Sequence, residues 1–159
     1  MKKLIITAIA ILIASAGSFS LANKSEDEKN VEQNFQSNVI KMTVYRTATC
    51  HCCGRYIDIL KKQGYEIEDI VTDDMNSVKE KFGIPYDKQS CHTVSVDNYF
   101  IEGHVPMDVV KKLLEERPEI DGIGLPGMRI GTPGMPGVKR APFEIFQAKD
   151  GEFSEYLKI

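Results

Sequence analysis

The chain has 159 residues, 42% hydrophobic and 27% charged, which is enough apolar material for one compact core and too little length for two domains. Its formal net charge of -3 gives no basic surplus, which argues against nucleic acid and anionic membrane surfaces as partners.

The first 22 residues have the pattern of a secretory signal peptide. Two lysines precede an uncharged apolar run from Leu4 to about Ala16, and Ser20-Leu21-Ala22 offers small residues to a signal peptidase. The alternative is a membrane anchor, but the run is shorter than the roughly 20 residues that span a bilayer. We therefore expect cleavage after Ala22 and a periplasmic mature protein with no membrane span.

Residues 23–38 are almost entirely polar and are expected to form a flexible leader, because they bury too little apolar surface to offset the entropy of ordering. The folded domain is predicted to span residues 39–159. Its first strand begins near Val39, where apolar and polar residues alternate. A helix from about Cys50 to Gly64, a strand at 65–71 and a short helix at 75–82 follow.

The next segment predicts a β-hairpin whose register can be counted. Residues 93–96 and 99–102 are strand-like and are separated by Asp97-Asn98, which suits a two-residue turn. The same count places Cys91 opposite His104, with Cβ atoms roughly 4.5–5.5 Å apart. His92 is then expected on the other face of the hairpin, unless the strand has already ended there.

The remainder predicts a helix at 106–116, a long Gly/Pro/Met loop at 121–142, and a closing hairpin around Asp150-Gly151. The sequence therefore predicts an α/β fold, with a central mixed sheet and flanking helices.

All four cysteines and all three histidines lie between Cys50 and His104. One interpretation is structural: two disulfides, Cys50–Cys53 and Cys52–Cys91, as an oxidising compartment favours. Adjacent Cys52 and Cys53 make two unstrained bridges difficult, because disulfide geometry is narrow. The other interpretation is a metal site, since a helix N-terminus stabilises thiolates. Thiolates with imidazoles suit copper(I), zinc or an iron–sulfur cluster, and the spacing alone does not select among them.

Four motifs in order resemble the CopG-type family of periplasmic copper-resistance proteins, long known as a domain of unknown function. They are Thr49-Cys50-His51-Cys52-Cys53, Ser90-Cys91-His92-Thr93, Glu102-Gly103-His104-Val105-Pro106 and Pro126-Gly127-Met128. The resemblance covers about residues 42–146. It implies a thioredoxin-like fold, copper as the bound metal, and a role in copper tolerance beside an efflux component, with copper(I)/copper(II) electron transfer as a further activity.

By position, the resemblance implies that Cys50, Cys52, Cys53 and Cys91 are sulfur ligands and that His104 is a nitrogen ligand. It also makes His92 a candidate ligand. The family more often has a small residue at the place of His51, which is either an added ligand or a water-facing side chain. Met128 is a candidate thioether cap, preferred over Met135, although methionine is more often an apolar gap filler.

In a thioredoxin-like fold, the segment before the third strand normally carries a cis-proline and lies against the redox cysteines. Here Ser90-Cys91-His92-Thr93 takes that place without a proline, which would turn a thiol-exchange site into a metal pocket. Two other functions stay open: a thiol–disulfide oxidoreductase that uses Cys50 as nucleophile and Cys53 as resolving thiol, and a passive copper carrier.

Overall fold

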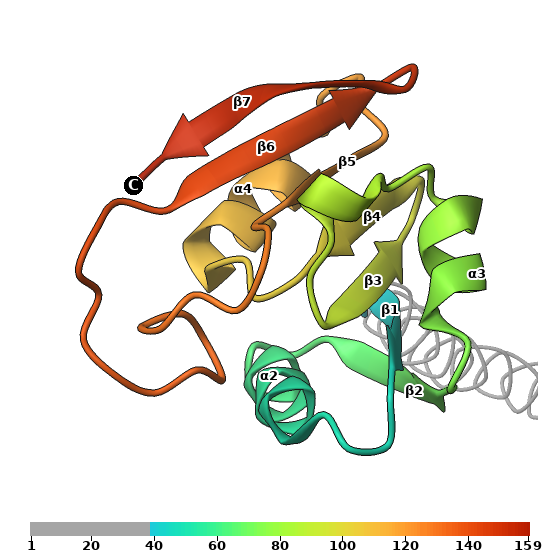
Figure 1. Cartoon of the computed structure of the whole chain (residues 1–159), viewed down its shortest axis with the longest axis vertical. Coiled ribbons are helices and arrows are strands. Elements are labelled where there is room, and N and C mark those ends of the chain that lie inside the picture. Colours follow the sequence, from blue (N-terminus) through green and yellow to red (C-terminus); the bar gives the residue numbers. More distant parts are fainter. Residues whose placement is uncertain (1–38) are drawn as a thin grey trace, which may run out of the picture. The chain divides into compact units, whose positions relative to one another are not determined.

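A seven-stranded mixed sheet forms the centre of the protein, which we describe from a computed structural model for residues 39–159 (Figure 1). The predicted signal peptide at 1–22 and the predicted leader at 23–38 lie outside the described residues. Within the described part of the chain, no helix is long and apolar enough to cross a membrane.

The first half of the domain has the predicted β-α-β-α order. Its elements are β1 (Lys41–Arg46), α2 (His51–Lys62), β2 (Glu66–Val71) and α3 (Met75–Lys81). Strands β1 and β2 are parallel, as expected when a helix crosses between them. The cysteines therefore lie where β1 turns into α2, as the sequence predicted.

The second half adds five strands and one further helix. After the short 3-10 helix η1 (Tyr86–Lys88) come β3 (His92–Val96), β4 (Tyr99–Glu102), α4 (Met107–Glu116), β5 (Gly122–Gly124), β6 (Glu144–Lys149) and β7 (Glu152–Lys158). The sheet order is β2-β1-β3-β4-β5-β6-β7. The predicted hairpin register is confirmed, with Val96 opposite Tyr99 and Val94 opposite Ile101.

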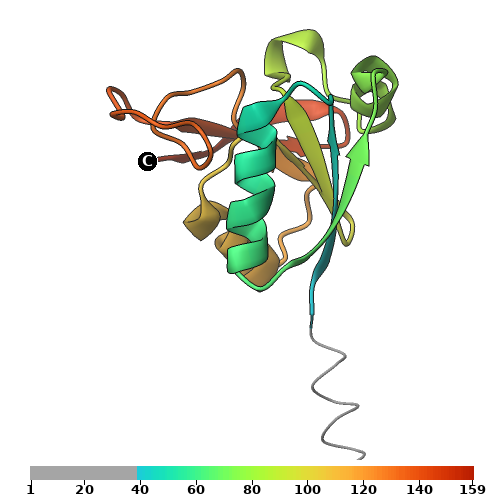
Figure 2. The same cartoon turned by 90° about the horizontal axis from the view of Figure 1, so that it is seen from below.

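Different helices pack on the two faces of the sheet. Helices α2 and α4 lie on one face and α3 lies on the other (Figure 2). The larger core includes Leu60 of α2 and Leu113 of α4 packed with Val94 and Ile101 of the sheet. The smaller core on the opposite face contains Ile84, Phe100, Phe146 and Ala148. This confirms an α/β fold with a mixed sheet, and it is compatible with the thioredoxin-like arrangement.

Strand β5 lies inside the segment predicted to be a loop. It has only three residues and two of them are glycines, which have low strand propensity. A Cβ at Gly124 would lie 2.3 Å from the Phe146 ring, so the residue is glycine because the neighbouring strand approaches closely. This contact joins residues that are distant in the sequence, so the local sequence pattern does not predict it.

Candidate metal centre

Three of the four cysteines lie at the start of α2. Cys50 is the residue that caps the helix, and Cys52 and Cys53 lie in its first turn. No acidic side chain lies in that turn and no side chain makes a capping hydrogen bond, so the three cysteine side chains and His51 surround the helix N-terminus. Backbone N–H groups at such an end favour negative charge.

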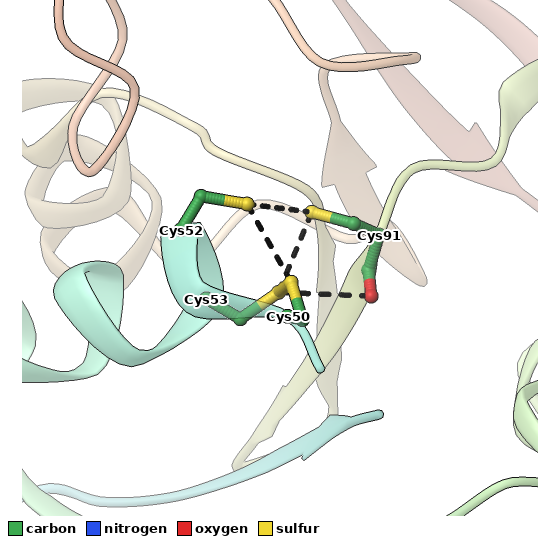
Figure 3. Close-up of side chains that lie close together, drawn as sticks. All are labelled: Cys50, Cys52, Cys53 and Cys91. Atoms are coloured by element: carbon green, nitrogen blue, oxygen red, sulfur yellow. Dashed lines mark hydrogen bonds between the residues drawn. A yellow bond between two sulfur atoms is a disulfide. The ribbon is translucent and has the colours of Figure 1, made fainter. Parts of the chain in front are cut away.

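The fourth cysteine comes from a distant part of the chain. Cys91 lies immediately before β3, and its sulfur is 3.5 Å from the Cys53 sulfur and 4.0 Å from the Cys52 sulfur (Figure 3). The segment before β3 thus lies against the cysteines of α2, as the thioredoxin-like comparison predicted. The sulfurs are close enough to share a metal ion.

One disulfide is present, between Cys50 and Cys53, while Cys52 and Cys91 are free thiols. The first bridge of the two-disulfide interpretation is therefore formed and the second is not. In this state Cys50 and Cys53 are not thiolates. Four thiol ligands become available only when two electrons and two protons reduce the bridge.

Two imidazoles complete the cluster. The Nε2 atom of His104 is 3.1 Å from the Cys91 sulfur, which agrees with the predicted pairing of these residues across the hairpin. The Nδ1 atom of His92 is 3.5 Å from the same sulfur, and the two imidazole centroids are 4.7 Å apart. The expectation that His92 faces away is wrong. Strand β3 begins at His92, so Cys91 is outside the strand and its side chain does not follow the alternation of faces.

The long loop fixes the orientation of His104. The imidazole Nδ1 is 2.7 Å from the Pro133 carbonyl oxygen and donates to it, which leaves Nε2 of the neutral ring as the atom with a free lone pair. The Arg55 side chain holds the same part of the loop by donating to the Gly134 carbonyl oxygen at 2.9 Å. A hydrogen bond of this kind is how proteins usually orient an imidazole ligand.

Burial controls protonation in the cluster. It lowers the pKa of His92 well below 6.5, and the nearby His104 and Lys79 charges act in the same direction. It also lowers the pKa of His104. Both imidazoles are therefore neutral near pH 7 and able to act as ligands. Burial raises the pKa of the Cys91 thiol to about 12, so a metal ion binding there must displace a proton.

The cysteines and histidines form two overlapping groups of four, and within each group the potential ligand atoms lie within 4.8 Å of one another. One group is Cys50, Cys52, Cys53 and Cys91, and the other is Cys53, Cys91, His92 and His104. The Nε2 atom of His92 is buried and has no hydrogen-bond partner. The other ring nitrogen of His92, Nδ1, is the one that faces the Cys91 sulfur. Sulfur and imidazole nitrogen are the donor atoms that soft metal ions such as copper(I) prefer. The donor set therefore fits a soft metal ion.

Known proteins are similar to this chain in sequence and fold. A family model described as "Protein of unknown function, DUF411" matches residues 88–135, which contain Cys91, His92 and His104. Two solved structures named "Copper resistance protein copG", Form 2 and Form 1, are each 35% identical to this chain with a TM-score of 0.70. The match covers 77% of this chain and 99% and 98% of theirs. The chain belongs to the CopG-type copper-resistance family. No curated protein matches it significantly.

Membership in the CopG-type family, together with the Cys/His cluster, supports a copper-related role. Two predicted ligands do not lie in the cluster. His51 is exposed and belongs to neither group of four. Met128 is 60% exposed and lines a surface groove whose lining contains none of the cysteines or histidines. Metal binding by these two side chains stays a prediction.

Sequence reasoning missed several residues around this CopG-type cluster. The ring of Tyr56 packs against His92 and His104 at centroid distances of 4.7 and 5.3 Å, and its hydroxyl donates to the Val105 carbonyl oxygen at 2.9 Å. Tyr56 lies within the predicted helix, and nothing in the local pattern predicts that its ring contacts two histidines. Glu102 lies in the third motif and is fully buried. No local pattern distinguishes such a residue from an exposed one.

Proposed function

We propose that this protein binds copper in the periplasm and contributes to copper resistance beside an efflux component. Cys50, Cys52, Cys53 and Cys91 supply sulfur ligands, and His92 and His104 supply nitrogen ligands. His51 and Met128 are candidates for the edge of the site. The periplasmic location is supported by the signal-peptide pattern of residues 1–22.

One observation carries the proposal: Cys53 and Cys91 belong to both groups of four potential ligands. A sulfur that serves both groups can bridge two metal ions, so the cluster has room for more than one copper. Thiolates favour copper(I) and imidazoles also suit copper(II). The mixed donor set therefore supports a centre that keeps copper in both oxidation states.

The test is an anaerobic copper(I) titration of the reduced protein and of single-residue variants. Replacing Cys50, Cys52, Cys53 or Cys91 by Ser, or His104 by Ala, should weaken binding strongly. Met135→Ala should change it little. Wild-type affinity in Cys91→Ser would contradict the proposal, because Cys91 is one of the two sulfurs that belong to both groups of four.

A second measurement separates redox chemistry from passive carriage. A redox centre passes one electron from copper(I) to an external acceptor and keeps the resulting copper(II), whereas a carrier releases the metal on oxidation. Electron paramagnetic resonance of the loaded, oxidised protein, with the free copper measured in the same sample, distinguishes the two outcomes.

The disulfide supports a second candidate function. Cys50 and Cys53 are bridged in a Cys-x-x-Cys pattern at a helix start, which is the arrangement of thiol–disulfide oxidoreductases. In that reaction the Cys50 thiolate attacks a substrate disulfide, and Cys53 then resolves the mixed disulfide. Reduction of insulin disulfides by the metal-free dithiol protein would support this function. Inertness in that assay, with tight copper uptake by the same sample, would dismiss it.

A further inference from the structure

A buried ion pair lies behind the metal centre, on the opposite face of the sheet. Lys79 of α3 and Glu102 of β4 are 2% and 0% exposed, and the Lys79 Nζ atom is 2.5 Å from Oε1 of Glu102. Thr93, which lies opposite Glu102 in the β3–β4 ladder, is also fully buried. Neither charged side chain is a ligand in the proposed function, so their burial needs another explanation.

The Glu102 carboxylate makes contacts on both sides of the Cys91-His92 pair. Oε1 of Glu102 accepts a hydrogen bond from the backbone N–H of Ser90 at 2.6 Å, and Oε2 accepts one from the Thr93 hydroxyl at 2.7 Å. The Lys79 ammonium donates to the Thr93 hydroxyl oxygen at 2.8 Å. The residues immediately before and after the two candidate ligands are therefore held by one carboxylate.

The same carboxylate belongs to the strand that leads to the third candidate ligand. Glu102 is the last residue of β4, and His104 follows two residues later. Between them, the backbone N–H of Gly103 donates to the His92 carbonyl oxygen at 3.0 Å. Glu102 thus ties the chain around Cys91 and His92 to the chain that carries His104, while its own oxygens stay on the far face of the sheet.

A buried ion pair is weak evidence for stability, because desolvating two charges costs about as much as their attraction returns. An apolar pair of similar size would fill the same space. The position of this pair suggests another role, since it contacts Ser90 and Thr93, the two residues that flank Cys91 and His92. We propose that Glu102, with Lys79 as its counter-ion, is a positioning residue that holds Cys91 and His92 in register with Cys53 and His104 for metal binding. This inference rests on the proposed function.

Two double variants separate positioning from simple stability. Lys79→Met with Glu102→Leu fills the space and removes the hydrogen bonds that Lys79 and Glu102 make with Ser90 and Thr93. Lys79→Met with Glu102→Gln also removes both charges, but its amide can accept from Ser90 and donate to Thr93. The matched control, Lys158→Met with Glu144→Leu, removes an exposed ion pair on the β6–β7 hairpin.

The first measurement is copper(I) affinity of the reduced protein against a chromophoric chelator. The Met/Leu variant should lose about 10- to 100-fold in affinity, as is typical when groups that orient metal ligands are removed. The Met/Gln variant and the control should stay close to wild type. Thermal unfolding of the metal-free proteins checks that every variant folds cooperatively.

The second measurement needs no metal. In a background with Cys50→Ser and Cys52→Ser, the neighbouring sulfurs of Cys53 and Cys91 should form a disulfide rapidly when diamide is added. The Met/Leu pair should slow this bridge formation and the Met/Gln pair should not. If the wild-type protein binds no copper(I), the proposed function is wrong. The rate of Cys53–Cys91 disulfide formation still tests whether the buried pair positions Cys91.

A Met/Leu variant with unchanged bridging rate and unchanged copper affinity would overturn the inference. If that variant does not fold, Thr93→Val replaces it, because it removes only the Thr93 hydroxyl from the same network. We expect slower bridging in Thr93→Val, and an unchanged rate there would overturn the inference equally.

Discussion

His104 depends on a residue 29 positions away in the chain. Its Nδ1 atom donates to the Pro133 carbonyl oxygen, and this leaves Nε2 directed toward the Cys91 sulfur. Pro133 can approach so closely because the next residue is Gly134. A Cβ on Gly134 would lie 2.7 Å from the Cys52 carbonyl oxygen and 3.1 Å from the Tyr56 nitrogen. The loop and the ligand helix therefore meet through backbone atoms.

We predict that Gly134→Ala weakens copper(I) binding, because the added methyl group pushes Pro133 away from His104. The matched control is Gly151→Ala. Both glycines have φ of +81°, so both changes should destabilise the protein by about 1–2 kcal/mol, but Gly151 has open space around it. Copper affinity and thermal unfolding of both variants check this. Equal copper affinity in the two would contradict it.

Tyr56→Phe should reduce the free energy of unfolding by about 1–3 kcal/mol, because it leaves the buried Val105 carbonyl without its donor. Copper affinity should be preserved, since the ring still packs against both imidazoles. Tyr99→Phe is the control: its hydroxyl donates to the Pro118 carbonyl oxygen away from the metal centre. A loss of copper affinity in Tyr56→Phe alone would show that the hydroxyl, and not the ring, orients the histidines.

Helix α3 is short, although it carries a buried charged side chain. It has seven residues, yet it carries the buried Lys79 that reaches Thr93 and Glu102 on the sheet. Its start is stabilised by Asp74, whose carboxylate accepts from the Ser77 N–H at 3.0 Å and from the Ser77 hydroxyl at 2.7 Å. A helix this short has little stability of its own, so its capping residue should matter.

We predict that Asp74→Ala lowers the melting temperature at pH 7 and that the difference from wild type disappears in acid. The two hydrogen bonds from Ser77 lower the pKa of Asp74 below 3.8. Because the folded-state pKa is lowered, the stabilisation is present above 3.8 and is lost as the pH falls through the folded-state pKa. Melting temperatures from pH 7 downward test this. Asp73→Ala is the control, because it removes the adjacent carboxylate and leaves both hydrogen bonds between Ser77 and Asp74 in place, so it should change the melting temperature less.

At the scale of the whole molecule, the sheet brings residues 50–53 and residues 91–104 together. Strand β1 leads into α2 and pairs with β3, so the end of β1 and the start of β3 lie side by side, with Arg46 opposite His92. The candidate metal centre thus lies at one end of two adjacent antiparallel strands. The disulfide decides how many of its sulfurs are available.

Copper(I) should raise the melting temperature of the reduced protein, because a ligand that binds only the folded state stabilises it by about 2.7 kcal/mol at 100 times its Kd. The oxidised protein should show a smaller shift, since Cys50 and Cys53 are bridged. Calorimetry with and without copper(I) measures both. Cys52→Ser with Cys91→Ser is the control and should show little shift in either state. Equal shifts for the oxidised and reduced wild-type proteins would count against the disulfide as a limit on binding.

Local patterns in the sequence were enough to predict most of the fold. The alternation in β1, the helical spacing of α2 and the two-residue turn between β3 and β4 each depend on neighbours in the chain. All three elements were predicted with the correct type, and the hairpin also with the correct register. The hairpin count even placed Cys91 beside His104. Strand β5 was missed because its glycines are chosen by the rings of Phe100 and Phe146, which come from other strands.

The sequence by itself determined which potential metal ligands the protein carries, because the residue types and their order in the four motifs do not depend on the fold. Tertiary structure alone decided how those groups are arranged: His92 faces the cluster, Met128 lies on a surface groove, and Glu102 is buried with Lys79. Burial and long-range contact depend on what the rest of the chain places around a residue. The neighbouring residues in the sequence therefore do not predict its burial or its long-range contacts.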